Sequence, residues 1–137
     1  VNTMRIKRGF EAAPYLSLRP FASAGARGLL GAGFGVAPEA EEYEAMRVEF
    51  LHNYESAIAE HSRLFAGVKE LLEGLVELGI TWGIVTNKAA RFTDQLVPLI
   101  QLEHAACVIS GDTTPHAKPH PEPLYEAARR INCDQEE

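Results

Sequence analysis

The chain has 137 residues, of which 46% are hydrophobic and 23% charged, and its formal net charge at pH 7 is -6. This apolar content excludes a disordered chain, and no apolar run reaches the roughly 20 residues that span a membrane. The negative charge and a pI near 5.4 leave no extended basic surface, which argues against nucleic acid as the main partner. We therefore expect a cytoplasmic protein with neither a membrane nor a nucleic-acid partner.

The first part of the chain, residues 1–64, is predicted to be all helical because its apolar side chains recur at helical spacing. Pro38, followed by three glutamates within four residues, predicts the start of a long helix that runs to about Glu60. Five glycines between Gly25 and Gly35 interrupt an otherwise helical segment. They predict tight helix packing or entry into a loop.

The second part, residues 65–137, alternates helical and strand-like patterns, which predicts an α/β arrangement with one βαβ crossover. Its first helix is strongly amphipathic and ends at Gly79, a residue that commonly follows a helix. The predicted elements are, in order, a helix over 68–78, a strand over 80–85, a helix over 89–100, a strand over 105–109 and a helix that starts at Pro121.

Two short segments carry the chemistry. Thr86 closes the apolar run before it and is followed by Asn87, so its hydroxyl should emerge at the carboxyl end of a buried strand, where α/β sheets bind ligands. Lys118 opens the segment Lys118-Pro119-His120-Pro121 and should approach the same crevice from the next crossover. Taken singly, Thr86 fits an ordinary strand end and Lys118 a solvated loop lysine; together they indicate a phosphate site.

These segments, WGIVTNK at 82–88 and KPHPEPL at 118–124, resemble the second and third motifs of haloacid dehalogenase superfamily phosphatases. With SRLF at 62–65 and the segment 3–35, they look most like phosphoglycolate phosphatases, and close to N-acetylmuramic acid 6-phosphate phosphatases. The resemblance implies a partial Rossmann-like core over residues 65–137 and an all-helical cap over residues 1–64. It also implies a Mg²⁺-dependent phosphomonoesterase that acts through an aspartyl phosphate.

The first and fourth motifs of the superfamily are absent, and these are the motifs that supply the nucleophilic Asp and complete the Mg²⁺ site. The three aspartates, Asp94, Asp112 and Asp134, form no Asp-x-Asp pair and follow no nucleophile strand. The chain therefore reads as an inactive fragment with no metal ligands of its own. An open strand edge in such a fragment would favour self-association.

The resemblance assigns roles to individual residues. Thr86 would donate its hydroxyl and Asn87 its backbone N–H to phosphoryl oxygens, and Lys118 would neutralise their charge. Gly25 and Arg27 lie in the cap turn that selects the leaving group, where Arg27 could grip a carboxylate or sugar oxygen. An ordinary helix-surface arginine remains the alternative for Arg27.

Other polar residues fit structural roles better. Lys88 and Arg91 could widen the positive field but suit solvated positions at a helix start. Cys107 and Cys133 lack metal-ligand spacing and read as reduced thiols. The histidines lack the pairing expected of a zinc site, although two of them flank Lys118; they are His52, His61, His104, His116 and His120.

Two further hypotheses stay open. The chain could be a binding or regulatory protein that keeps a phosphate pocket without catalysis, or a purely structural helical module. The module would have no affinity for phosphate analogues, whereas the binding protein would bind phosphate without releasing it from a substrate.

Overall fold

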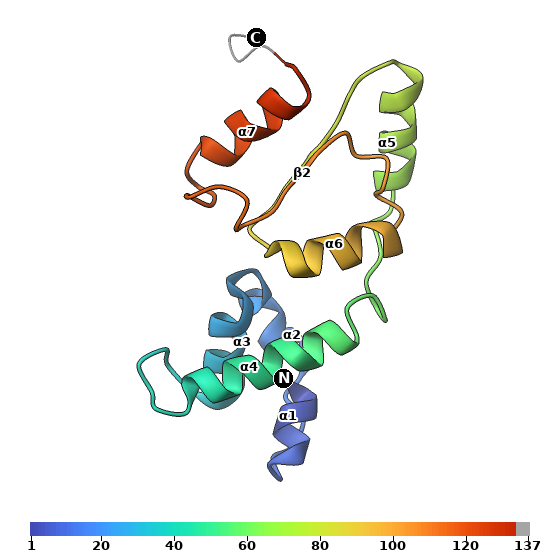
Figure 1. The fold of residues 1–137 in the computed structure, drawn as a ribbon. Helices are drawn as coiled ribbons and strands as arrows, with labels where there is room; N and C mark the ends of the chain where they lie inside the picture. The colour runs from blue at the N-terminus through green and yellow to red at the C-terminus, as the bar shows by residue number, and fades with distance from the viewer. Residues whose placement is uncertain (134–137) are drawn as a thin grey trace. The chain divides into compact units, whose positions relative to one another are not determined.

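The structure is a computed structural model that describes residues 1–133. The chain divides into two compact units, Val1–Ala57 and Ile58–Glu137, called here the N-terminal and the C-terminal unit. The division falls after Ala57, a few residues before the boundary after residue 64 that the sequence predicts. The two units are described separately (Figure 1).

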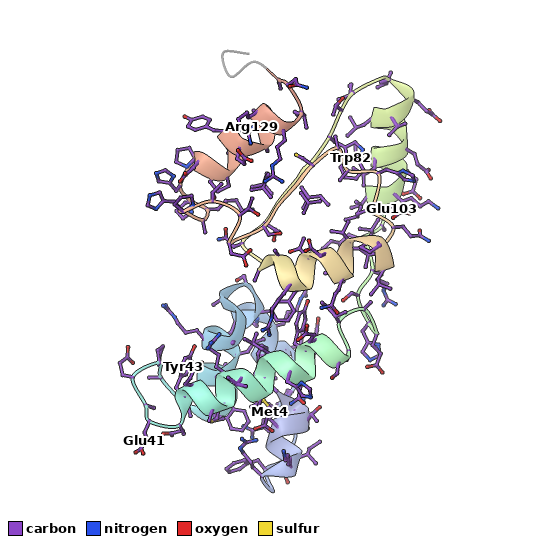
Figure 2. The ribbon with its side chains drawn as sticks, viewed as in Figure 1. Met4, Glu41, Tyr43, Trp82, Glu103 and Arg129 are labelled. Carbon is purple, nitrogen blue, oxygen red and sulfur yellow. The ribbon has the colours of Figure 1, made fainter. Side chains whose placement is uncertain are left out.

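The N-terminal unit is entirely helical, as predicted. Its core consists of three buried side chains, Met4, Leu30 and Met46, which come from the first helix, the middle of the unit and the last helix; Met4 is labelled in Figure 2. The elements are α1 (Asn2–Lys7), α2 (Tyr15–Leu18), the 3-10 helix η1 (Arg19–Ala24), α3 (Gly25–Phe34) and α4 (Tyr43–Ser56). Helix α3 packs against all of the others, so it organises the unit.

The glycines between 25 and 35 do not interrupt the helix. Helix α3 is continuous through them and ends at Gly35 in the left-handed conformation (φ 72°). A Cβ at Gly28 would lie 2.6 Å from the carbonyl oxygen of Phe21 and 2.6 Å from Cβ of Ala24. Tight packing against η1 is therefore the reason for a glycine at this position.

The prediction for the long helix was wrong at both ends. Helix α4 starts at Tyr43, not at Pro38, and ends at Ser56. Between Pro38 and Tyr43 the backbone makes successive tight turns. In these turns the Ala40 N–H donates to the Ala37 carbonyl and the Tyr43 N–H to the Ala40 carbonyl, both at 3.0 Å. Proline and acidic residues also suit such turns, so they marked the approach to the helix and not its first residue.

The C-terminal unit contains the predicted crossover. Strands β1 (Ile84–Val85) and β2 (Val108–Ile109) pair in parallel, with Ile84 opposite Val108, and α6 (Ala90–Leu99) connects them. Helix α5 (Val68–Glu77) precedes β1, and α7 (Glu122–Arg130) packs on both strands (Figure 1).

The strands are shorter than predicted, although the ladder of hydrogen bonds continues past them. Ala106 N–H donates to the Trp82 carbonyl and Thr86 N–H to the Ile109 carbonyl, each at 2.9 Å. Ile80 instead closes the end of α5, because its N–H bonds the Leu75 carbonyl at 2.8 Å. This bond turns the chain into the strand and leaves Ile80 outside it.

Helix α5 is amphipathic, but none of its residues is buried. An open hollow of about 770 Å³ lies between one side of α5 and the segment that carries Glu103, and Trp82 contributes to its lining (Figure 2). Within residues 1–133, no helix is both long and apolar enough to cross a membrane.

Candidate phosphate site at the end of strand β1

Lys118 lies at the carboxyl end of β1. Its ammonium group donates a hydrogen bond of 2.7 Å to the carbonyl oxygen of Val85, the last residue of the strand. The side chain is otherwise exposed. An ammonium group has three N–H donors, so two remain without a partner among residues 1–133. The structure thus brings Lys118 next to Thr86 across 32 residues of sequence.

Thr86 is half-buried and directly follows β1. Its backbone N–H belongs to the ladder with Ile109, while its hydroxyl oxygen accepts a hydrogen bond of 3.1 Å from the Lys88 N–H. The hydroxyl proton has no acceptor within the described chain. The local turn therefore holds the oxygen in place and leaves the proton available to a ligand.

Asn87 connects β1 to the Lys118 segment through its side chain. Its Nδ2 donates to the carbonyl oxygen of Lys118, and its Oδ1 accepts from the Lys118 N–H, both at 2.9 Å. The amide thus pairs with both backbone groups of a single residue. The sequence predicted a role only for the backbone N–H of Asn87, which makes no hydrogen bond to any residue from 1 to 133.

Several hydrogen-bond donors at this strand end have no partner among residues 1–133. They are the hydroxyl of Thr86, the N–H of Asn87 and two N–H groups of the Lys118 ammonium. Unsatisfied donors and a positive charge at the carboxyl end of a parallel strand form a site suited to an anion. Phosphoryl oxygens, which carry delocalised negative charge, match these donors.

The segment after β2 packs closely on this strand end. Gly111 N–H donates to the Lys88 carbonyl at 2.8 Å, and a Cβ at Gly111 would come within 2.7 Å of the Asn87 carbonyl carbon. No side chain fits there without moving the Asn87 backbone. Gly111 therefore lets the two segments touch.

Asp112 has a role that sequence analysis missed. Its Oδ1 accepts a hydrogen bond of 2.8 Å from the Ala90 N–H, the first residue of α6. A carboxylate favours the positive end of a helix dipole and satisfies an orphan donor there. The residue caps a helix that begins 22 positions earlier, so no local sequence signal could reveal the contact.

The predicted cap residues belong to the N-terminal unit. Gly25 is the first residue of α3 and has a positive φ of 61°. Arg27, in the first turn of α3, is exposed and forms no hydrogen bond or ion pair with residues 1–133. Both residues are therefore sterically accessible within their own unit.

The other basic residues, histidines and cysteines that the sequence singled out lie in different local environments. Lys88 supports Thr86 through its N–H, and the guanidinium of Arg91 lies 4.3 Å from the centroid of the Phe92 ring. The rings of His116 and His120 are tilted by 41° to each other with their centroids 4.5 Å apart, and His120 Nδ1 accepts from the Glu122 N–H at 3.2 Å. Cys107 is buried and Cys133 exposed.

Within residues 1–133, no three His, Cys, Asp or Glu side chains come together in a way that could hold a metal ion. Oxygen ligands from several carboxylates or carbonyls are what Mg²⁺ requires. The described residues do not fit a magnesium site, and Asp134 lies outside them.

The sequence pattern of the haloacid dehalogenase-like hydrolases matches residues 32–137. The chain belongs to this family. A solved structure described as a predicted phosphoglycolate phosphatase from Haemophilus somnus superposes on this haloacid dehalogenase-like chain with a TM-score of 0.77 at 21% identity, over 96% of this chain and 62% of that one. This likeness confirms the predicted fold class, a partial α/β core with a helical part.

The relatives with a curated name belong to two kinds of phosphatase. An N-acetylmuramic acid 6-phosphate phosphatase of Pseudomonas putida is 39% identical over 134 residues, which are 97% of this chain and 60% of that protein. A phosphoglycolate phosphatase of Xanthomonas campestris pv. campestris is also 39% identical, over 96% of this chain and 59% of that protein. This haloacid dehalogenase-like chain therefore spans about 60% of the length of these relatives.

Proposed function

We propose that this chain carries the phosphate-binding part of a phosphomonoester hydrolase most like the phosphoglycolate phosphatases. The observation that carries the proposal is the group of free donors at the end of β1, where Lys118 bonds the Val85 carbonyl beside Thr86. The names of the relatives support it, because both name hydrolysis of a phosphate ester.

The residues of this chain would hold and neutralise the phosphoryl group. Thr86 would donate its hydroxyl and Asn87 its N–H to two phosphoryl oxygens, and Lys118 would counter the charge that spreads over them. Such donors lower the barrier when they are already in place before the reaction, because no reorganisation is then needed. Lys118 and Thr86 are thus the proposed catalytic residues.

The nucleophile is not part of this mechanism. An aspartyl phosphate, implied by the family resemblance, requires a carboxylate beside Thr86. Of the described aspartates, Asp112 caps α6 and Asp94 lies on α6. We therefore propose that this chain alone releases no phosphate. The Mg²⁺ requirement is likewise a proposal for the family's complete site, since the described residues do not form one.

The substrate would be a small phosphorylated acid or sugar in the cytoplasm. Arg27 and Gly25, in a helical cap of residues 1–64, are proposed to contact its leaving group. Phosphoglycolate is the main candidate. N-acetylmuramic acid 6-phosphate is the second, because a relative with that name is equally identical, at 39%. A non-catalytic phosphate-binding protein is the alternative outside the enzymes.

The test compares this chain with a longer form that extends to the length of its relatives. Phosphate release from both candidate substrates is measured with Mg²⁺. Release only by the longer form supports the proposal, and the preferred substrate separates the two names. Release by this chain alone contradicts the proposal that it lacks the nucleophile. If either form binds phosphate saturably and neither releases phosphate from a substrate, the non-catalytic phosphate-binding protein is favoured.

We also propose that the exposed edge of the two-stranded sheet promotes self-association. Within the described residues β1 pairs only with β2, so each strand has one edge without a partner strand. Unpaired edges invite pairing between chains. Sedimentation velocity over a range of concentrations tests this proposal, and a strictly monomeric species contradicts it.

A further inference from the structure

The carboxamide of Asn87 connects the end of β1 to the segment before α7. It bonds the N–H and the carbonyl of Lys118 simultaneously, each at 2.9 Å. A primary amide and the backbone of a single residue are complementary in this way, since each offers one donor and one acceptor to the other. The contact joins residues 31 positions apart.

The position of Lys118 depends on this contact. Lys118 lies in a segment without regular secondary structure between β2 and α7, and its side chain is exposed. A lysine in such a segment is free to sample many rotamers, and ordering it on binding reduces affinity. Here its backbone is held by Asn87 and its ammonium by the Val85 carbonyl. Both anchors lie on the strand end that carries Thr86.

We propose that Asn87 is a positioning residue, which places the Lys118 ammonium for phosphate through the paired hydrogen bonds of its side chain. The proposal rests on the phosphate site described above. It differs from the role predicted from the sequence, in which Asn87 uses only its backbone N–H. That N–H would remain in any substitution at position 87, so the two roles can be separated.

The chain offers a matched control. Asn2 forms the same two-point contact with Ala13, at 3.0 Å to the carbonyl and 2.9 Å from the N–H, in the N-terminal unit. Substituting either asparagine by alanine removes the same pair of hydrogen bonds. Only Asn87→Ala releases a lysine, so an effect on Lys118 that Asn2→Ala lacks separates positioning from a general loss of stability.

Two readouts are measured on the whole chain. The first is the ¹H–¹⁵N signal of the Lys118 ammonium without phosphate, which a fixed hydrogen bond protects from exchange with water. We expect this signal in the parent and in Asn2→Ala and its loss in Asn87→Ala. The second is the affinity for inorganic phosphate, followed by the amide shifts of Thr86 and Gly111. We expect a roughly three- to tenfold weaker affinity in Asn87→Ala alone.

Each outcome decides the inference. A protected ammonium signal in Asn87→Ala, or phosphate affinity equal to that of the parent, overturns it. Absence of saturable phosphate binding in the parent would refute the proposed function instead, and the ammonium signal would then decide the inference alone. Should Asn87→Ala not fold, Asn87→Gln, which shifts the amide by one methylene, replaces it in both measurements with the same expected and contradicting results.

Discussion

The two units contain the same side-chain contact with different surroundings. In the N-terminal unit, Asn2 pairs with the backbone of Ala13 and ties the start of α1 to the segment before α2. In the C-terminal unit, Asn87 pairs with the backbone of Lys118 at the end of β1. The hydrogen bonds have nearly equal lengths, yet one holds a methyl group and the other an ammonium.

This difference shows that a hydrogen-bond pattern by itself does not define a site. Ala13 offers no group to a ligand, so its contact only stabilises a loop. The side chain of Lys118 extends from the backbone that Asn87 holds and donates to the Val85 carbonyl. Its ammonium thus lies beside the hydroxyl of Thr86, whose proton has no acceptor within residues 1–133. Function follows from what the held residue carries and from the strand end where it is held. The predictions below test this distinction, first through ligand binding and then through stability, where they run from the largest expected effect to the smallest.

Removing the charge at position 118 should have the largest effect on ligand binding. Lys118→Met keeps the length of the side chain but loses the ammonium, and hydrogen bonds to charged groups contribute roughly 1.5–3 kcal/mol. We expect phosphate affinity to fall roughly 10- to 100-fold, measured by titration followed by amide shifts. The control is Lys69→Met, which removes the charge of an exposed lysine in α5. Equal losses in both variants would point to net charge and not to the site.

The buried cores should respond alike in the two units. Leu30 and Ile109 are both fully buried, one in α3 and the other in β2. Truncation of either to alanine should cost about 2–5 kcal/mol of unfolding free energy, through lost burial and the cavity that remains. Urea unfolding followed by circular dichroism measures the loss. A loss below about 1 kcal/mol for Ile109→Ala would indicate that β2 is not a firm support for the site.

Glycine substitutions should separate the units. At Gly111 a Cβ would meet the backbone of Asn87, which cannot turn away, so Gly111→Ala should cost about 1–3 kcal/mol. At Gly33 the nearest atom, at 2.5 Å, is Cγ1 of Val1, the far end of a side chain. Rotation about the Cα–Cβ bond of Val1 can move that methyl group aside, and alanine favours a helix over glycine, so Gly33→Ala should stay within about 1 kcal/mol of the parent.

The same urea unfolding measurement checks both glycine variants. A Gly111→Ala variant as stable as the parent would mean that the segment after β2 can move away from Asn87. In that case the close contact at the site would not constrain the strand end. Gly74→Ala, where the new Cβ would meet nothing within 4 Å beyond its chain neighbours and the backbone of its own helix, provides a third reference and should be slightly stabilising.

Acid should have the smallest effect. In α7, hydrogen bonds from Arg129 and Arg130 lower the pKa of Glu126 to about 2. Arg8, at the end of α1, holds the pKa of Glu49 in α4 below its ordinary value, with a smaller contribution from Lys7. A lowered pKa in the folded state stabilises the fold above the ordinary value near 4.5, and this contribution disappears as the pH falls towards 2.

Glu126→Gln should therefore be slightly less stable than the parent at neutral pH, and the two should converge between pH 4.5 and 2. Urea unfolding at a series of pH values, followed by the fluorescence of Trp82, measures the difference. Glu49→Gln is the corresponding variant in the N-terminal unit. A constant difference from pH 7 to pH 2 would show that the carboxylate charge is not the cause.

Sequence patterns predicted most of the elements because their signals are local. The apolar stripe of α5 and the glycine that follows it mark a helix and its end, and Gly79 adopts the positive φ, 69°, that this position favours. Thr86 follows a run of residues that favour β-strands, and it lies at the end of β1 as predicted. Local signals failed at Pro38, where turns and helix starts prefer the same residue types.

What the sequence by itself determined is the helical first part, the parallel crossover and the residue types on which the proposed phosphate site rests. The tertiary structure alone decided which residues meet: the amide of Asn87 with Lys118, the carboxylate of Asp112 with the start of α6, and Gly111 with the Asn87 backbone. The physical reason is distance along the chain. These contacts join positions 22 to 31 apart, and hydrogen bonds of this range leave no periodic trace in the residues between them.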